Sequence, residues 1–244
     1  MGKIEILTKL KANRLVLVVR GESSEEALAC SLASIEGGIK TIEVTYTNPF
    51  ASEVIGQLAE RFKEDPEVLI GAGTVLDDVT ARQAILAGAQ FIVGPNFNRA
   101  VALICHRYSI PYLPGCMTVN EVVTALESGV DMVKIFPGST VGISFIRAIK
   151  SPLPQVEVMV TGGVSSDNLK DWLAAGVDVL GIGGEFNQLA SQKQYNLITK
   201  KAAHYIKVCD NNLKNVFTLA LVLVKTFFII HSINMLLLMF FQII

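Results

Sequence analysis

Short apolar runs alternate with amphipathic stretches along residues 15–208. The runs are rich in β-branched residues, which is typical of buried strands in a parallel sheet. Between them, apolar positions recur at helical spacing, as in residues 23–38 and 119–129. We expect strands at 15–21, 41–47, 69–75, 91–96, 111–116, 132–138, 157–163 and 179–184.

The connections between these runs carry the signals of helix ends. Several helical stretches begin with Ser, Asp or Asn and finish on a glycine, namely Gly37, Gly88, Gly129 and Gly176. A regular alternation of eight β-α units predicts an α/β fold, a (β/α)8 TIM barrel. A doubly wound open sheet is the alternative, but no GxGxxG motif follows the first strand.

The two ends of the chain differ in character. Residues 1–14 predict a short amphipathic helix and lack the apolar core of a signal peptide. We assign residues 1–208 to the barrel and residues 209–244 to a hydrophobic C-terminal extension. Residues 216–244 contain no Gly, Pro or acidic residue and are long enough to span a bilayer.

Three interpretations of residues 216–244 compete: a membrane anchor, an element packed on the barrel, and a segment unrelated to the barrel. We favour the third, such as a read-through or frameshift product, because Phe, Ile, Leu, Asn and Lys are what AT-rich codons encode without selection for folding. Lys225, His231 and Asn234 interrupt the apolar run and weaken the anchor hypothesis.

Composition narrows the function classes further. The 244 residues carry a net charge of −1, with no basic block, which argues against nucleic acid as the main partner. The four cysteines show no CxxC spacing and the three histidines are scattered, so we expect no metal site and no cofactor. A reduced, cytoplasmic compartment is the prediction.

Strand alternation indicates which side chains face the inside of the barrel. In residues 41–47, Glu43 and Thr45 point inward while their neighbours cover the outside. In residues 132–138, Lys134 shares a face with Phe136. Arg20 shares a face with the inward positions of the first strand. Glu43 and Lys134 are therefore expected to enter one cavity from different strands.

This pair suggests carbon–carbon bond chemistry. An apolar surrounding disfavours an ammonium, and a neutral Lys134 amine can attack a ketone to form a Schiff base. The iminium withdraws electrons, so that a bond β to it can break, and Glu43 is placed to move the protons. A purely structural alternative is a buried Lys134–Glu43 ion pair that holds the barrel together.

A second set of residues is rich in glycine. Residues 161–164 read TGGV and residues 181–185 read GIGGE, each at the end of a predicted strand. Paired glycines let backbone N–H groups approach an anion, and SSDN at 165–168 is expected to open a helix whose dipole favours it. Tight turns are the alternative explanation. Arg20, Thr74 and Thr161 lie at strand ends and can hold a carboxylate or phosphate.

The ordered set VVRG, GGIKTIEVT, IGAGTV, LPGCMT, VKIFPG and TGGV resembles the class I 2-keto-3-deoxy-6-phosphogluconate / 4-hydroxy-2-oxoglutarate aldolase family over about residues 4–208. The resemblance implies a (β/α)8 barrel, usually a homotrimer, that splits a 2-keto-3-deoxy sugar acid into pyruvate and an aldehyde. It also implies a small-molecule 2-keto-3-deoxy acid as the substrate.

The resemblance also implies roles for residues. Lys134 would form the Schiff base, and Glu43 would act through a water as general acid and base. Thr74, Thr161 and Pro95 would lie around the substrate, and Phe136 would line the pocket beside the lysine. From their places at strand ends, Arg20 and Thr47 complete the predicted substrate-binding residues, and the predicted phosphate-binding residues are Gly162, Gly163, Gly183 and Gly184.

Two departures from the family pattern concern binding. Many members read EVTLRT, whose arginine binds the pyruvyl carboxylate, where this chain has Thr47. Many members also read IGGS after the last strand, where this chain has Glu185, which would repel a phosphate dianion if it pointed inward.

Three hypotheses follow. The leading one is a Schiff-base aldolase for 2-keto-3-deoxy-6-phosphogluconate, with 4-hydroxy-2-oxoglutarate or a non-phosphorylated sugar acid as other substrates. The second is a phosphate-binding barrel with epimerase or synthase chemistry, in which Lys134 is only an electrostatic group. The third is a sugar-acid binding or membrane-tethered protein without catalysis.

Overall fold

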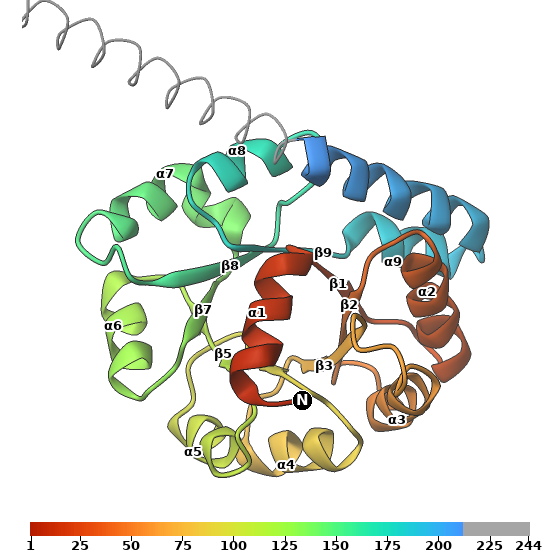
Figure 1. Cartoon of the computed structure of the whole chain (residues 1–244), viewed down its shortest axis with the longest axis horizontal. Coiled ribbons are helices and arrows are strands. Elements are labelled where there is room, and N and C mark those ends of the chain that lie inside the picture. The colour runs from red at the N-terminus through yellow and green to blue at the C-terminus, as the bar shows by residue number, and fades with distance from the viewer. Residues whose placement is uncertain (212–244) are drawn as a thin grey trace, which may run out of the picture. The chain divides into compact units, whose positions relative to one another are not determined.

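Parallel strands alternate with helices along residues 1–211, the part of the chain that this computed structural model describes (Figure 1). The strands are β1 Leu15–Val19, β2 Thr41–Thr45, β3 Leu69–Gly73, β4 Ile92–Val93, β5 Tyr112–Leu113, β6 Gly115–Cys116, β7 Met132–Ile135, β8 Glu157–Thr161 and β9 Val179–Ile182. The helices are α1 Lys3–Asn13, α2 Ser24–Glu36, α3 Ala51–Arg61, α4 Asp78–Leu86, α5 Arg99–Arg107, α6 Val119–Glu127, α7 Gly138–Lys150, α8 Leu169–Ala174 and α9 Gly184–Ser191. Residues 195–211 are also helical.

The strands form a nearly closed barrel. Their order is β5-β4-β3-β2-β1-β9-β8-β7-β6, and all registered neighbours are parallel. β5 and β6, at the two ends of this order, are separated only by Pro114. Proline cannot donate to the ladder, so it divides what is otherwise one barrel strand. Eight β-α units therefore close the ring, and the predicted (β/α)8 fold is confirmed.

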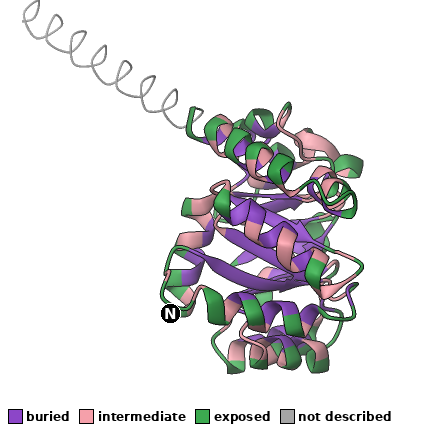
Figure 2. Cartoon of the chain, turned by 90° about the vertical axis from the view of Figure 1, so that its right-hand side faces the viewer, coloured by how far each residue is buried: buried purple, intermediate pink, exposed green. Residues whose placement is uncertain are grey.

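Strand register sorts the side chains as alternation predicted. Glu43 pairs with Val18 on one side and Gly71 on the other, and Lys134 pairs with Gly115 and Met159. The inward apolar side chains form one cluster, which consists of Ile6, Leu7, Leu10, Val16, Leu69, Phe91, Val93, Leu113, Met132, Met159 and Val179. Figure 2 shows the strands almost entirely buried, apart from the half-buried ends of β8, while the helices turn their exposed faces to solvent.

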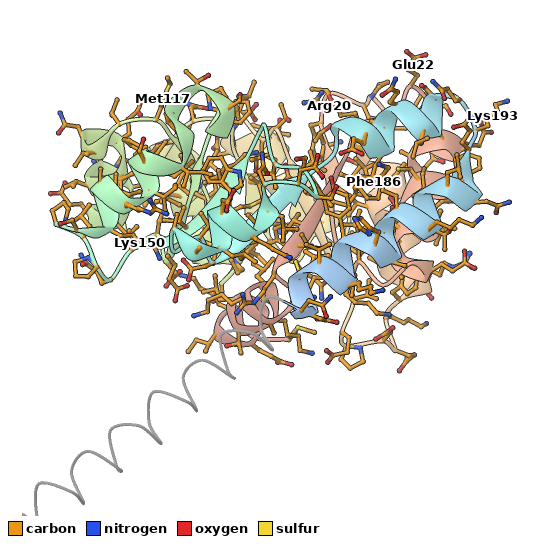
Figure 3. All side chains as sticks on the ribbon, turned by 90° about the horizontal axis from the view of Figure 1, so that it is seen from above. Arg20, Glu22, Met117, Lys150, Phe186 and Lys193 are labelled. Atoms are coloured by element: carbon orange, nitrogen blue, oxygen red, sulfur yellow. The ribbon has the colours of Figure 1, made fainter. Side chains whose placement is uncertain are left out.

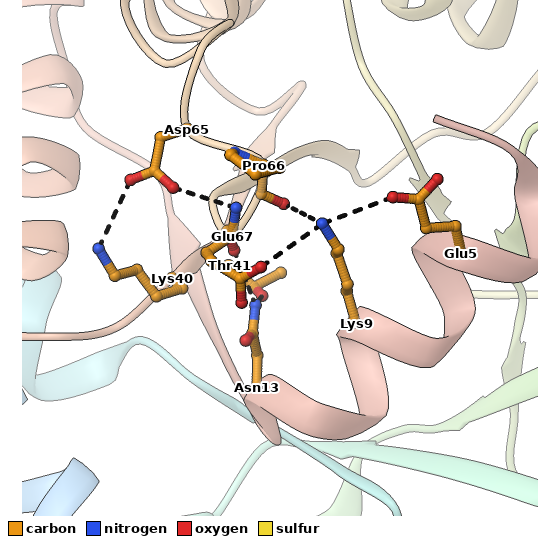
Figure 4. Close-up of polar contacts among 8 residues, drawn as sticks. All are labelled: Glu5, Lys9, Asn13, Lys40, Thr41, Asp65, Pro66 and Glu67. Carbon is orange, nitrogen blue, oxygen red and sulfur yellow. Dashed lines mark hydrogen bonds and ion pairs between the residues drawn. The ribbon is translucent and has the colours of Figure 1, made fainter.

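Helix α1 closes the end of the barrel at which the strands begin (Figure 1). Its buried residues Ile6, Leu7 and Leu10 belong to the interior cluster. Polar contacts fasten its edge: Lys9 donates to the Pro66 carbonyl at 2.5 Å, and Asn13 donates to Thr41 Oγ1 at 2.9 Å (Figure 4). With this end sealed, a pocket in the barrel must open at the carboxyl ends of the strands.

Most of the C-terminal extension lies beyond residue 211, the last residue that the structure describes. The expectation for residues 216–244 concerns positions beyond the described residues. Within residues 1–211, no helix has the length and apolar character needed to cross a membrane. The division of the chain at residue 208 stays a prediction.

Candidate active site

Lys134 and Glu43 meet inside the barrel. Lys134 lies on β7 and Glu43 on β2, and these strands stand on opposite walls of the closed ring. The Lys134 Nζ atom lies 3.7 Å from Oε1 of Glu43. Lys134 is 6% exposed and Glu43 is 0% exposed. The pair that strand alternation predicts is therefore present and buried.

The two glycines of β3 make room for the inward side chains of Glu43 and Phe91. A Cβ atom on Gly73 would lie 2.1 Å from Glu43 Oε1, and one on Gly71 would lie 2.4 Å from the Phe91 ring. Both contacts are far shorter than a van der Waals distance, so neither position accepts a larger residue without a shift. Gly73 thus leaves the space in which the carboxylate lies, and Gly71 leaves room for the Phe91 ring.

Burial controls the proton affinity of Glu43. Desolvation raises the pKa of its carboxyl group, and the nearby charges of Lys134 and then Arg20 act in the opposite direction. Both carboxylate oxygens lack a hydrogen-bond partner among the described residues. A raised pKa, together with carboxylate oxygens that no described group occupies by a hydrogen bond, suits a group that accepts and returns a proton.

A pocket of about 390 Å³ opens at the carboxyl ends of β1, β8 and β9. Its lining consists of Val18, Arg20, Phe136, Thr161, Gly162, Gly163, Val164, Ser165, Gly181, Gly183, Gly184, Glu185, Phe186, Asn187 and Tyr205. Figure 3 shows Arg20 and Met117, which follow β1 and β6, at the same end of the molecule. Lys134 lies next to this pocket, because its Nζ atom is 5.2 Å from the centre of the Phe136 ring.

Seven of the predicted binding residues line this pocket, namely Arg20, Phe136, Thr161, Gly162, Gly163, Gly183 and Gly184. The Thr161 hydroxyl is buried and has no partner among the described residues. Such an orphaned hydroxyl at the base of a pocket is available to a bound molecule. Within residues 1–211, no group of three or more His, Cys, Asp or Glu residues could hold a metal ion.

The glycine segment after β8 adopts a backbone that requires glycine. Gly162 and Gly163 have φ values of 92° and 79°, in the left-handed region. The helix that follows begins at Leu169 rather than directly at the SSDN segment. Asn168 explains the delay, because its side chain accepts from the Ser165 N–H at 2.9 Å and donates to the Gly163 carbonyl at 2.7 Å. These bonds hold residues 165–168 in a turn before the helix.

Three other predicted residues lie outside the pocket lining. Thr47 is exposed, and its hydroxyl exchanges a hydrogen bond of 2.7 Å with the buried Thr45 hydroxyl. Thr74 has a φ of 55°, an uncommon value for a β-branched residue. The backbone of Pro95 lies against Gly115, where an added Cβ would be 2.0 Å from the Pro95 oxygen. The proline thus borders the register partner of Lys134.

Several residues of the pocket were not predicted. The Asn187 side chain accepts from the Arg20 N–H at 2.8 Å and donates to the Val18 carbonyl at 2.8 Å, which fixes the end of β1. Tyr205 comes from the helical residues 195–211, 23 positions after Ile182, where the last strand ends. No sequence pattern identifies these contacts, since they depend on how distant helices pack.

Comparison with protein families gives one description for most of the chain. The family model described as "KDPG and KHG aldolase" matches residues 6–202. A 2-dehydro-3-deoxy-phosphogluconate aldolase of Treponema pallidum (strain Nichols) is 38% identical over 184 residues, which are 75% of this chain and 86% of the relative. A 2-dehydro-3-deoxy-6-phosphogalactonate aldolase of Escherichia coli (strain K12) is 33% identical over 194 residues, 79% of this chain and 93% of the relative.

A solved structure extends the likeness to three dimensions. The KDPG aldolase of Legionella pneumophila superposes with a TM-score of 0.73 at 30% identity and covers 80% of this chain and 95% of its own. That crystal structure holds pyruvate captured at low pH as a covalent carbinolamine intermediate.

Proposed function

This chain belongs to the KDPG and KHG aldolase family, and on that premise we propose that it cleaves 2-keto-3-deoxy-6-phosphogluconate to pyruvate and glyceraldehyde 3-phosphate through a Schiff base on Lys134. One observation carries the proposal: Lys134 Nζ lies buried, 3.7 Å from a carboxylate that has no hydrogen-bond partner among the described residues. The family name covers 4-hydroxy-2-oxoglutarate as well, whose cleavage gives pyruvate and glyoxylate by the same steps.

The first steps make the substrate electrophilic. The neutral Lys134 amine attacks the C2 ketone to form a carbinolamine, which loses water to give an iminium. Glu43 lies within reach of the reacting centre and accepts and returns protons during this exchange, directly or through a water. Its carboxyl group suits this task because burial raises its pKa above the ordinary value of a glutamate.

Cleavage then uses the iminium as an electron sink. Glu43 removes the proton of the C4 hydroxyl, and the C3–C4 bond breaks. C4 leaves as the aldehyde, and the electron pair of the broken bond stays on C3 and converts the iminium into an enamine. The enamine takes a proton at C3 from Glu43 and becomes the iminium of pyruvate. Water hydrolyses this iminium, which releases pyruvate and restores the Lys134 amine.

The pocket supplies binding groups for both ends of the substrate. Arg20 carries the guanidinium of the lining and is suited to an anionic group, and Thr161 offers its orphaned hydroxyl. Phe136 and Pro95 flank the reacting carbons, and Thr74 lies at the end of β3. Gly162 and Gly163, with Gly183 and Gly184, present backbone N–H groups for the phosphate. Thr47 takes the place of the arginine of other members, so carboxylate binding relies on hydroxyls and backbone N–H groups, while Arg20 lines the pocket together with the glycines proposed for the phosphate.

The oligomeric state and the location belong to the same proposal. The homotrimer follows from the resemblance alone, and the cytoplasmic location follows from the cysteine usage. Neither changes the chemistry within one barrel.

Reductive trapping tests the proposal directly. Incubation with pyruvate and borohydride is expected to leave a secondary amine adduct that peptide mapping places on Lys134. Lys134→Met removes the adduct and the turnover together, because the nucleophile is gone. Lys134→Arg keeps the charge but cannot form the Schiff base, so it is expected to be inactive as well. An unmodified wild-type protein, or an active Lys134→Arg variant, would contradict the proposal and favour the epimerase or synthase hypothesis.

A further inference from the structure

Glu185 places a carboxylate in the wall of the pocket, beside the glycines proposed to hold the phosphate. It is in the first turn of α9 and lines the pocket together with Gly183 and Gly184. A free carboxylate at this place would repel a phosphate dianion. The arrangement of its neighbours determines whether this charge acts on the substrate.

Both oxygens of Glu185 are engaged by the helical residues 195–211. Lys201 Nζ donates to Oε2, and the Tyr205 hydroxyl donates to Oε1 at 2.9 Å. Lys201 and Tyr205 are four residues apart, so they project from one face of this helix. The carboxylate is therefore directed towards the helix by two donors.

Tyr205, which donates one of these hydrogen bonds, is buried. Tyr205 is 1% exposed, and its ring contacts the edge of the Phe186 ring at a centroid distance of 5.5 Å. The hydrogen bonds from Lys201 and Tyr205 lower the pKa of Glu185, which keeps the carboxylate ionised at neutral pH. Burial raises the pKa of Tyr205, so its hydroxyl stays a neutral donor.

The net charge at the pocket wall then depends on Lys201. With Lys201 paired to Glu185, the two charges offset one another and Arg20 supplies the net positive field. Without the ammonium, the Glu185 carboxylate would offset Arg20, and its side chain would be free to turn towards the glycines. The positive field of Arg20 would be cancelled in the region where an anionic end of the substrate lies.

We infer that Lys201 and Tyr205 hold the Glu185 carboxylate away from the glycine cradle and offset its charge, and that this contact sets the preference of the pocket for phosphorylated over non-phosphorylated 2-keto-3-deoxy acids. The inference rests on the proposed aldolase function. Lys201 is a positioning residue, since it acts on the substrate through Glu185.

Kinetics with two substrates test this inference. In the full-length chain, Lys201→Met is expected to raise the KM for 2-keto-3-deoxy-6-phosphogluconate by about ten-fold. The kcat, and the KM for non-phosphorylated 2-keto-3-deoxygluconate, stay within about two-fold of wild type. Adding Glu185→Gln to Lys201→Met restores the KM for the phosphorylated substrate, because the repelling charge is removed. Lys201→Arg retains the wild-type KM for the phosphorylated substrate, because the guanidinium still pairs with the Glu185 carboxylate.

Lys200→Met is the matched control, since it removes the same charge from an exposed neighbouring position of the helix. It is expected to leave both KM values unchanged. An unchanged KM for the phosphorylated substrate in Lys201→Met would overturn the inference. So would a raised KM that persists in the double variant, which would mean that Lys201 acts independently of Glu185.

The outcome is separable from the aldolase proposal. Pyruvate trapping on Lys134 does not involve the phosphate end of the pocket, so it is expected to be normal in every Lys201 and Glu185 variant. If a variant folds poorly, the two KM values still report selectivity, because loss of folded protein lowers the apparent kcat for both substrates and leaves KM unchanged.

Discussion

At the scale of residues, Glu43 illustrates a conflict between stability and function. A fully buried carboxylate without hydrogen bonds is costly, and its ion pair with Lys134 at 3.7 Å offsets this cost only in part, since its pKa remains raised. The same cost makes the group useful as a proton carrier. We therefore expect that a substitution of Glu43 can increase the stability of the protein but cannot retain its activity.

Glu43→Gln tests this conflict. The kcat is expected to fall by about 10²- to 10⁴-fold, because the proton carrier is lost. The pKa of Glu43 is higher in the folded wild type than in the unfolded chain, where it is near 4.5. The folded state therefore binds the proton more tightly, and Glu43 contributes to stability at low pH. This contribution is lost as the pH rises through the pKa of the folded state. Glu43→Gln has no carboxyl group at this position, so its stability lacks this dependence on pH.

Thermal unfolding of both proteins between about pH 5 and pH 8 measures the difference. The Tm of the variant relative to wild type is expected to rise with pH. A difference that is constant or falls over this range would show that Glu43 is not a destabilised carboxylate.

At the scale of elements, strand β3 contributes to the site through its glycines, because their lack of side chains leaves space. Gly73 occupies an inward position, and its missing Cβ leaves the space that Glu43 Oε1 fills. A strand of ordinary residues would form the same ladder but would not admit the carboxylate. The short strand therefore contributes to the site by its shape.

Gly73→Ala is expected to displace Glu43, because the new Cβ would lie 2.1 Å from its Oε1. We expect at least a ten-fold loss of kcat with a smaller effect on Tm, since a side-chain end rather than backbone must move. Gly56→Ala is the control: it lies inside α3, where the nearest atom would be the Ala87 oxygen at 3.7 Å. That substitution is expected to stabilise the protein by about 0.5–1 kcal/mol and to leave kcat unchanged. Equal activities of the two variants would contradict the role of Gly73.

At the scale of the whole molecule, the barrel separates stability from chemistry. Helix α1 seals the end at which the strands begin, and the candidate site opens at the other. The interior cluster lies between them. Changes at the sealed end are therefore expected to affect the free energy of unfolding and not the chemistry.

Leu10→Ala tests this separation. Leu10 is 0% exposed in the interior cluster, so its truncation is expected to cost about 2–5 kcal/mol of stability. The kcat and KM, measured well below the lowered Tm, are expected to match wild type. Ile4→Ala on the same helix is the control, because Ile4 is 81% exposed and its loss is expected to cost at most about 0.5 kcal/mol. A large change in KM for Leu10→Ala would show that the two ends are coupled.

Much of this arrangement could be predicted before the structure. Alternation placed Glu43 and Lys134 on inward faces, and the repeated β-α units indicated a closed barrel, so the meeting of these two side chains was predictable. The structure adds the distance and the burial, while the catalytic roles stay predictions. The helix start after β8 was placed too early, because the Asn168 side chain competes for the backbone groups of the preceding turn.

The sequence by itself determined the periodic properties of this protein: which segments are strands and helices, which side chains face inward, and which residue types are available for chemistry. These follow from local propensity and from the fixed periods of the two structures. Only the tertiary structure decided the environment of Glu185, which depends on Lys201 and Tyr205 from a later helix. It also decided that Gly73 makes room for Glu43. Contacts of this kind depend on the packing of distant segments, and a linear pattern carries no record of which surfaces meet.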